Sequence, residues 1–235
     1  MNTPPLPSLD DIQAAVEEAG QLALDLGPRN PTRKNDGTWV TEADLALSKL
    51  LKKSLAEVCP EAEYLDEEQG GRVGEGLGWV VDPIDGTTNF KRGDDRWCVS
   101  VALMHQGVPC VGMIHQPSLG RTWAAGPDET RFAVDGPGDV GILIGGRLPR
   151  SASRWLRMWR ATGNFRSTRM TGSAALDLVD VARGRAERTM AFGLSLWDYA
   201  AGWLLVEKGG GTIQRWKVGT GWDLLVTHAG AAENT

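Results

Sequence analysis

The sequence predicts an α/β protein whose N-terminal half is α+β and whose C-terminal half alternates strand with helix. Three observations predict this class. Two segments with helical periodicity open the chain, several short apolar segments between turn residues follow, and beyond residue 138 strand and helix patterns alternate. With 235 residues, the chain can bury roughly 70 to 75 per cent of the surface that it exposes when unfolded, which is enough for an enzyme-sized core.

The first two elements are predicted to be helices. Apolar residues recur at helical spacing through residues 8–27, and a Gly-Pro pair ends this stretch. Residues 28–40 are polar and are expected to form a loop. A second helix is predicted from Thr41 to about Val58, because Pro60 cannot continue a helix.

Short strands are predicted next, each an apolar run between turn residues. They are expected at residues 62–65, 79–81, 97–104, 108–115 and 121–124. The dipeptide Gln106-Gly107 separates the third strand from the fourth and is typical of a hairpin turn. Helices that cover an antiparallel sheet are therefore expected in this half.

The pattern changes after a Gly- and Pro-rich stretch at residues 135–149. Strand and helix then alternate, which indicates α/β layering. Strands are predicted at 141–145, 166–170, 188–192 and 211–216, and helices at 151–160, 173–183 and 196–208. We place a boundary here, between an N-terminal subdomain of residues 1–137 and a C-terminal subdomain of residues 138–235.

The composition argues against several kinds of partner. The formal net charge is -5 and Lys and Arg are scattered, so the basic stripe that nucleic acid requires is absent. The N-terminus lacks signal-peptide features, and no apolar run approaches membrane-spanning length. Cys59, Cys98 and Cys110 lack the spacing of a disulfide framework or a zinc site. We therefore expect a cytoplasmic protein that binds neither nucleic acid nor membrane.

The most informative segment is DPIDGTTNF at residues 82–90, which follows an apolar strand. Asp82 and Asp85 are three residues apart, Pro83 fixes one φ angle between them, and Ile84 leaves a free carbonyl. Both acids and that carbonyl can face one cation, and Mg²⁺ prefers such hard oxygen ligands. The Gly-Thr turn that follows can direct backbone N–H groups at an anion. The segment thus predicts a metal ion that holds a phosphate.

Other acids can add to this site. Glu67 and Glu68 end another short strand, and Asp198 lies in the first turn of a predicted helix. If such acids converge within about 4 to 5 Å, each pair repels by roughly 3 to 4 kcal/mol at an effective dielectric near 20. The cluster would therefore require divalent cations.

Simpler interpretations stay open for each segment taken alone. Three copies of one helix-capping pattern occur, at Ser8-x-x-Asp11, Thr41-x-x-Asp44 and Ser195-x-x-Asp198. Capping is the favoured role for Asp44 or Asp198 in isolation. Asp82 and Asp85 also suit ordinary Asp-Pro and Asp-Gly turns, and Glu67-Glu68 suits a solvated acidic loop.

Taken together, the segments resemble the inositol monophosphatase family, part of a larger group of magnesium-dependent, lithium-sensitive phosphatases. Four motifs occur in order, at Lys34 through Asp44, Glu67-Glu68, Trp79 through Phe90, and Trp197 through Gly202. A fifth, Gly172-Ser173-Ala174-Ala175, is similar to the start of the family's substrate-side helix. The resemblance covers about residues 8–216.

The resemblance implies a layered sandwich of alternating helices and sheets, of the inositol monophosphatase and fructose bisphosphatase type, assembled as a homodimer. It also implies roles for matching residues. The implied ligands of two or three Mg²⁺ ions are Glu67, Asp82, Asp85, Asp198 and the carbonyl of Ile84. The implied catalytic residues are Asp44, Thr87 and, through its metal, Glu67. The implied phosphate contacts are the N–H groups of Gly86 and Thr87, and the implied substrate contacts are Asp85, Gly172, Ser173 and Ala174.

This set implies a magnesium-dependent phosphomonoesterase that acts on a small phosphorylated polyol or sugar, nominally converting inositol 1-phosphate to inositol and phosphate. Alternatives with the same fold are a fructose 1,6-bisphosphatase, a histidinol-phosphate phosphatase and a 3'-phosphoadenosine nucleotidase. The alternative from another class is a catalytically silent binding or regulatory protein. Lithium inhibition is expected from the resemblance alone.

Three features depart from the inositol-specific pattern. Ala191 stands seven residues before Asp198, where a Glu commonly holds the ring hydroxyls of inositol. Asp66 stands where Gly usually precedes the Glu pair, and the tail after Trp216 is short for the family. The identity of the alcohol is therefore the least specified part of the prediction.

Overall fold

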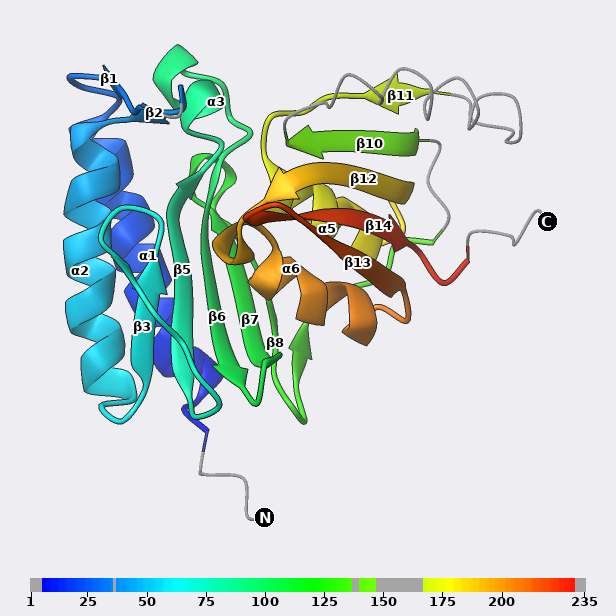
Figure 1. Cartoon of the computed structure of the whole chain (residues 1–235), viewed down its shortest axis with the longest axis horizontal. Coiled ribbons are helices and arrows are strands. Elements are labelled where there is room, and N and C mark those ends of the chain that lie inside the picture. The colour runs from blue at the N-terminus through cyan, green and yellow to red at the C-terminus, as the bar shows by residue number, and fades with distance from the viewer. Residues whose placement is uncertain (1–5, 36, 137–139, 147–166, 231–235) are drawn as a thin grey trace.

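Helices and sheets alternate as four layers in the computed structural model, which describes residues 6–35, 37–136, 140–146 and 167–230 (Figure 1). The order is a helix pair, a seven-stranded sheet, a second helix pair and a five-stranded sheet. The predicted fold class, a layered sandwich with an α+β N-terminal half and an α/β C-terminal half, is confirmed.

The outer helix pair consists of α1 (Leu9–Leu26) and α2 (Glu42–Val58). Both helices begin as the sequence predicts, because Ser8 accepts a hydrogen bond from the N–H of Asp11 and Thr41 caps α2. Their apolar stripes pack against one face of the first sheet, and the resulting cluster is one of two apolar cores. A short hairpin of β1 (Thr32–Arg33) and β2 (Trp39–Val40) lies in the polar segment between the two helices.

The first sheet has the strand order β4-β3-β5-β6-β7-β8-β9. Its strands are β3 (Glu63–Asp66), β4 (Gly70–Gly71), β5 (Gly78–Asp85), β6 (Cys98–His105), β7 (Val108–Gln116), β8 (Arg121–Ala125) and β9 (Thr130–Arg131). Gln106 and Gly107 join β6 to β7 with φ angles of 52° and 76°, as a type I′ hairpin turn requires. The expectation of an antiparallel sheet is wrong for one pair. Strands β3 and β5 are parallel, because the chain returns through β4 and the loop at residues 72–77 before β5 begins.

Strand β5 extends well beyond its predicted core at residues 79–81, and all eight of its residues are buried. Its pairing with β6 shifts register between Asp82 and Asp85. Pro83, which cannot donate a ladder hydrogen bond, falls in this irregularity. The two acids therefore belong to the strand rather than to an ordinary turn. Helix α3 (Thr87–Arg92), which is absent from the predicted elements, follows directly.

The inner helix pair, α5 (Ala174–Ala182) and α6 (Leu196–Lys208), lies between the two sheets (Figure 1). The second apolar core joins these helices to both sheets, with Ala102 of β6, Leu178 of α5 and Val226 of the second sheet among its members. This arrangement places the first turn of α6 beside the end of β5, which positions the site described below.

The second sheet has the strand order β11-β10-β12-β14-β13. Its strands are β10 (Val140–Gly146), β11 (Thr168–Arg169), β12 (Ala186–Leu194), β13 (Thr212–Val218) and β14 (Gly221–Thr227). Strand β14 is absent from the predicted elements, although it pairs with both β12 and β13. The signal for it is the apolar set Trp222, Leu224, Leu225 and Val226 after a turn at Gly219, whose φ is 60°.

Two predictions lie outside the described residues. These are the helix at residues 151–160 and the boundary between residues 137 and 138. The division into two subdomains therefore stays a prediction. Within the described part of the chain, every helix is too short or too polar to cross a membrane.

Candidate active site

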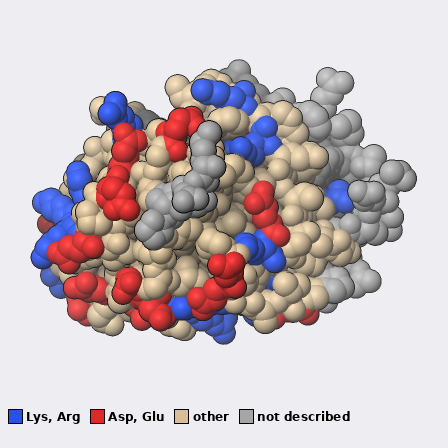
Figure 2. Space-filling model, turned by 90° about the horizontal axis from the view of Figure 1, so that it is seen from below, with Lys and Arg blue, Asp and Glu red and all other residues tan. Residues whose placement is uncertain are grey.

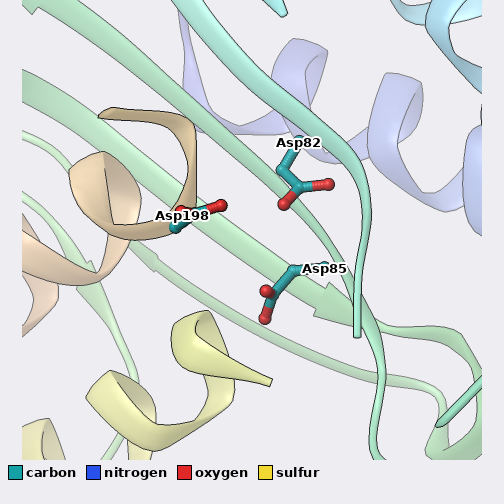
Figure 3. Close-up of side chains that lie close together, drawn as sticks. All are labelled: Asp82, Asp85 and Asp198. Carbon is teal, nitrogen blue, oxygen red and sulfur yellow. The ribbon is translucent and has the colours of Figure 1, made fainter. Parts of the chain in front are cut away.

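Three acids meet where β5 ends and α6 begins. Asp82 and Asp85 lie on β5, Asp198 lies in the first turn of α6, and their side chains point toward one another (Figure 3). One carboxylate oxygen from each lies within 4.8 Å of the others. At this separation each pair of charges repels by about 3 to 4 kcal/mol if the effective dielectric is near 20. Because a divalent cation removes this repulsion and carboxylate oxygens suit Mg²⁺, the donor set fits a hard divalent metal.

Burial makes negative charge on these acids costly. Asp82 is 1% exposed and Asp85 is 7% exposed. Burial raises the pKa of Asp82, and the nearby carboxylates of Glu67, Asp85 and Asp198 raise it further. Burial also raises the pKa of Asp85 to about 6, although a hydrogen bond from Ser173 opposes this, and it raises the pKa of Asp198. The carboxylates therefore need a compensating cation to stay ionised together.

Glu67 lies beside the three acids and lines the same cavity. Lys34 Nζ lies 2.7 Å from Glu67 Oε1 and 2.6 Å from Glu68 Oε1. Burial lowers the pKa of Lys34, but the two carboxylates together raise it above its ordinary value. Burial raises the pKa of Glu68 to about 7, and its side chain is only 4% exposed. The interpretation of Glu67-Glu68 as a solvated acidic loop is therefore wrong.

Asp66, the departure from the family pattern, anchors the turn that carries Glu67. It is fully buried, and its Oδ2 accepts a hydrogen bond from Ser48 Oγ at 2.6 Å. Its Oδ1 accepts from the N–H groups of Glu68 at 2.9 Å and Gln69 at 2.5 Å. Where glycine would give only flexibility, this acid ties the Glu pair to α2.

Two acids, Asp44 and Asp198, each cap a helix and also lie in the site. Asp44 Oδ2 accepts from the Thr41 N–H at 2.7 Å, while Asp44 Oδ1 lies 3.3 Å from the hydroxyl of Thr87. Asp198 Oδ2 accepts from the Ser195 N–H at 2.7 Å while Asp198 still offers an oxygen to the acid cluster. The capping interpretation is therefore correct for both residues, and it does not exclude a functional role.

The turn between β5 and α3 forms one side of the site. Gly86 has φ of 92°, and a Cβ there would lie 3.0 Å from the backbone oxygen of Arg96. Only glycine suits this position. The Thr87 hydroxyl lies 3.1 Å from the carbonyl oxygen of Ile84, so that carbonyl oxygen faces the start of α3. Ile84 also lines the cavity.

The predicted substrate residues divide into two groups. Gly172 lines the cavity, whereas Ser173 and Ala174 are not among its described lining residues. Ser173 Oγ instead donates to Asp85 Oδ2 at 2.5 Å, and the Ala175 N–H donates to the same oxygen at 2.9 Å. The start of α5 therefore fixes the orientation of Asp85.

The cavity around these groups has a volume of about 330 Å³. Its described lining residues are Gly37, Thr38, Trp39, Glu67, Asp82, Ile84, Asp85, Gly86, Thr87, Thr88, Gly172 and Asp198. Residues 37–39 and Thr88 are not among the site residues that the sequence predicts. The available signal was their position beside Thr41 and Thr87 in two of the motifs.

Ala191, where the family commonly has a Glu, does not line this cavity in the described structure. It is 3% exposed and belongs to the apolar core between the two sheets.

The chain has the fold and the acidic site of a metal-dependent phosphoric monoester hydrolase. The model of one family of such enzymes matches nearly the whole chain. Residues 9–235 match the model described as the inositol monophosphatase family. The chain belongs to that family. The match also continues past residue 216, where the motifs alone suggested that the resemblance ends.

Individual relatives carry two kinds of name. An inositol-1-monophosphatase of Mesorhizobium japonicum is 32% identical over 219 residues, which are 86% of this chain and 82% of that protein. A Nus factor SuhB of Xylella fastidiosa is 31% identical, and the alignment covers 88% of this chain and 81% of the Xylella protein. Among solved structures, the extragenic suppressor protein suhB of Bartonella henselae is 27% identical, with a TM-score of 0.82 over 94% of each chain.

Proposed function

We propose that the chain is a magnesium-dependent phosphomonoesterase of a small phosphorylated polyol or sugar, with inositol 1-phosphate as the nominal substrate. The convergence of Asp82, Asp85 and Asp198 beside the Asp44–Thr87 pair supports this proposal most directly. Phosphate monoesters hydrolyse extremely slowly without a catalyst. An anionic ester repels its nucleophile, so the reaction requires positive charge and a positioned water.

The proposed metal ligands are the residues that share the acidic side of the cavity. They are Glu67, Asp82, Asp85, Asp198 and the carbonyl of Ile84, and they would hold two or three Mg²⁺ ions. When bound, magnesium lowers the pKa of a water and offsets negative charge on the phosphoryl and leaving oxygens. Ser173 and Ala175 restrict Asp85 to one orientation, which keeps its other oxygen available.

Asp44 and Thr87 accept the proton in this proposal. The hydroxyl of Thr87 has one proton, which it can donate either to Asp44 Oδ1 or to the carbonyl of Ile84. When it donates to Asp44, the lone pairs of the Thr87 oxygen can accept from a water. As that water attacks phosphorus, a proton of the water passes to Thr87 and the threonine proton passes to Asp44. The bond from phosphorus to the alcohol oxygen breaks, and the alcohol oxygen leaves with the bonding electron pair and takes a proton from solvent. Burial raises the pKa of Asp44, which makes it a stronger base.

The remaining predicted residues would hold the ester. We assign the phosphoryl oxygens to the N–H groups of Gly86 and Thr87 at the start of α3. Gly172 would contact the alcohol directly, and Ser173 and Ala174 would act through the position of Asp85 and the α5 terminus.

The test is phosphate release from inositol 1-phosphate and from a panel of sugar, polyol and nucleotide phosphates, with Mg²⁺ and after chelation. We expect release that requires Mg²⁺, is inhibited by lithium, and falls on the order of a hundredfold in Asp82→Asn. The panel also separates inositol phosphatase activity from the three alternatives of the same fold. If no ester in the panel releases phosphate in a metal-dependent manner, the proposal is wrong.

A second candidate function follows from the relatives that are named Nus factors. The Xylella protein and a Pseudomonas aeruginosa protein, 32% identical over 88% of this chain, both carry that name. A role in binding a partner could coexist with catalysis on this fold. A strain carrying Asp82→Asn distinguishes the two, because a binding role survives loss of phosphate release.

The quaternary structure and location belong to the same proposal. We infer a homodimer that acts in the cytoplasm on a small metabolite. Light scattering coupled to size exclusion checks the first inference, since the monomer mass is 25.4 kDa. Cell fractionation checks the second.

A further inference from the structure

One wall of the cavity is built by the hairpin of β1 and β2. Apart from the acids, the β5–α3 turn and Gly172, the described lining comes from residues 37–39. Trp39 is the single aromatic residue in that described lining. The volume of about 330 Å³ leaves room for a small ring next to a phosphate.

Trp39 is held from two sides. Its backbone pairs with Arg33 across the hairpin, where the N–H of Lys34 also donates to the carbonyl of Thr38 at 2.8 Å. Its indole ring packs against α3, because Lys91 Nζ lies 3.3 Å from the ring centroid. Figure 1 shows the hairpin beside α3 at the end of the first sheet where β5 terminates. A substrate group can therefore approach only the other face or the edge of the indole.

The same wall offers few side chains that could hold hydroxyl groups. Gly37 and Gly172 have no side chain, and Thr38 carries one hydroxyl. Ala191, where the family pattern has a Glu for ring hydroxyls, is buried in the apolar core. The described residues of this wall therefore offer few side chains that could accept hydrogen bonds from the hydroxyl groups of the alcohol.

We propose that Trp39, positioned by Lys91, is the specificity-determining residue for the alcohol, and that it selects phosphomonoesters whose alcohol contains a ring. This inference rests on the proposed phosphatase function. The C–H face of a cyclitol chair, or the plane of a heteroaromatic ring, buries apolar area against the indole, whereas an open-chain alcohol does so much less. Stacking of this kind tolerates changes in ring identity, which suits a wall with few hydrogen-bonding side chains.

The test is the ratio of kcat/KM for a ring ester to kcat/KM for an open-chain ester, with saturating Mg²⁺. The probes are inositol 1-phosphate, 2′-AMP and glycerol 2-phosphate. Trp39→Ala lowers both ring-to-chain ratios by about tenfold, which lies within the range for stacking on an aromatic side chain. The loss falls mainly on KM. Trp39→Phe retains most of the preference, and Lys91→Gln, which removes the cation and keeps the chain length, gives an intermediate ratio.

Trp216→Ala is the matched control, because this tryptophan is 50% exposed on β13 and lies outside the cavity. It leaves both ratios unchanged. Thermal unfolding of each variant shows whether the fold persists, and Lys91→Gln, whose expected ratio is intermediate, keeps the test informative if Trp39→Ala unfolds.

One result would overturn the inference, namely an unchanged ratio in folded Trp39→Ala. The ratio is unchanged if no ester is affected, and also if glycerol 2-phosphate and the ring esters lose activity equally. In both cases metal-dependent hydrolysis itself continues, so the proposed phosphatase function stands. If the unmodified protein hydrolyses none of the three esters, it is the proposed function that fails.

Discussion

Single side chains in this site perform two tasks with their two oxygens. Asp44 uses Oδ2 to cap α2 and directs Oδ1 at Thr87. Asp198 caps α6 and also faces Asp82 and Asp85. A helix terminus is a stiff support for a reactive group, because the cap fixes the side-chain rotamer.

At the residue scale, the first prediction separates the two tasks of Asp44. Asp44→Asn retains an oxygen for the cap but loses the proton acceptor, so activity falls roughly a hundredfold or more while the unfolding temperature changes little. Asp44→Ala loses the same activity and also about 1 kcal/mol of stability through the missing cap. Steady-state kinetics and urea unfolding measure the two effects.

Asp11 provides the control for this experiment. It occupies the same position in the capping pattern of α1, where its carboxylate accepts from Ser8 Oγ at 2.7 Å in an exposed setting. Asp11→Ala changes stability alone. Equal losses of activity in the Asp11 and Asp44 variants would mean that Asp44 acts only as a cap.

At the scale of elements, two loops are tied together behind the cavity. Arg96 donates to Asp177 Oδ1 and to Asp180 Oδ2, each at 2.8 Å. Asn89 Nδ2 donates to the carbonyl of Thr171 at 2.8 Å and to that of Arg96 at 2.7 Å. This network joins α3 to the segment that carries Gly172, so it holds the two sides of the cavity together.

A second prediction concerns this network. Asp177 is 1% exposed, and burial raises its pKa to about 7 although Arg96 lowers it. A raised folded-state pKa means that the contribution of Asp177 to stability is complete at low pH and is lost as pH rises through 7. Arg96→Ala leaves the carboxylate unpaired, so it destabilises the protein by roughly 3 kcal/mol at pH 8 and by much less at pH 5.5. Urea unfolding at both values measures this difference.

The double variant Arg96→Ala with Asp177→Asn tests the cause. The amide carries no charge, so this variant regains most of the stability at pH 8. A destabilisation by Arg96→Ala that is equal at the two pH values would show that packing, and not charge, is responsible.

An element could be predicted when the residues that indicate it lie close together along the sequence. The helices α1 and α2 have long apolar stripes, caps and stop residues, so their limits agree with the prediction within two residues. Strand β5 was predicted too short, because Pro83 suggests a turn unless its bulge against β6 is known. The six residues of α3 are too few for a periodic pattern.

The site shows the same difference between features indicated by neighbouring residues and contacts between distant ones. The acids lie in compact motifs, so their approach to one another could be predicted, as could the Gly-Thr turn that follows β5. The bond from Ser173 to Asp85 joins residues 88 positions apart, and the contact of Lys91 with Trp39 depends on how a hairpin and a helix pack. Such contacts have no local sequence signal, and neither does the burial of Ala191 in the core.

At the scale of the whole molecule, acidic and basic side chains are mixed on the surface, whereas a group of acids meets in the interior. The surface seen from below carries acidic and basic side chains side by side (Figure 2). The interior holds Asp82 and Asp85 with Asp198 beside them. Metal binding should therefore affect the stability of the entire fold.

A third prediction follows from this coupling. The folded-state pKa values of Asp82 and Asp198 are raised, and that of Asp85 is about 6. The contribution of Asp85 to the stability of the metal-free protein is therefore complete below about pH 4 and is lost as pH rises through 6, and the contributions of Asp82 and Asp198 are lost in the same direction as pH rises. Mg²⁺ binds the ionised acids, so its thermal stabilisation is larger at pH 8 than at pH 5.5. Differential scanning calorimetry with Mg²⁺ and with chelator measures this.

Asp82→Asn is the matched variant, since the amide nearly preserves volume and removes one charge. It unfolds at a higher temperature than the unmodified metal-free protein at pH 8, and Mg²⁺ adds little to it. A Mg²⁺ effect that is independent of pH, or undiminished in this variant, would show that the ion binds elsewhere.

Strand β14 has a consequence for how the molecule is made. It is the last strand along the chain, yet it lies inside the second sheet between β12 and β13. While a ribosome synthesises the protein, the residues that form the acid cluster emerge before residues 221–227, which complete the sheet over α6. The packing around Asp198 on α6 is therefore completed by a segment that contributes no residue to the acid cluster. Removal of that segment should abolish activity as completely as loss of an acid.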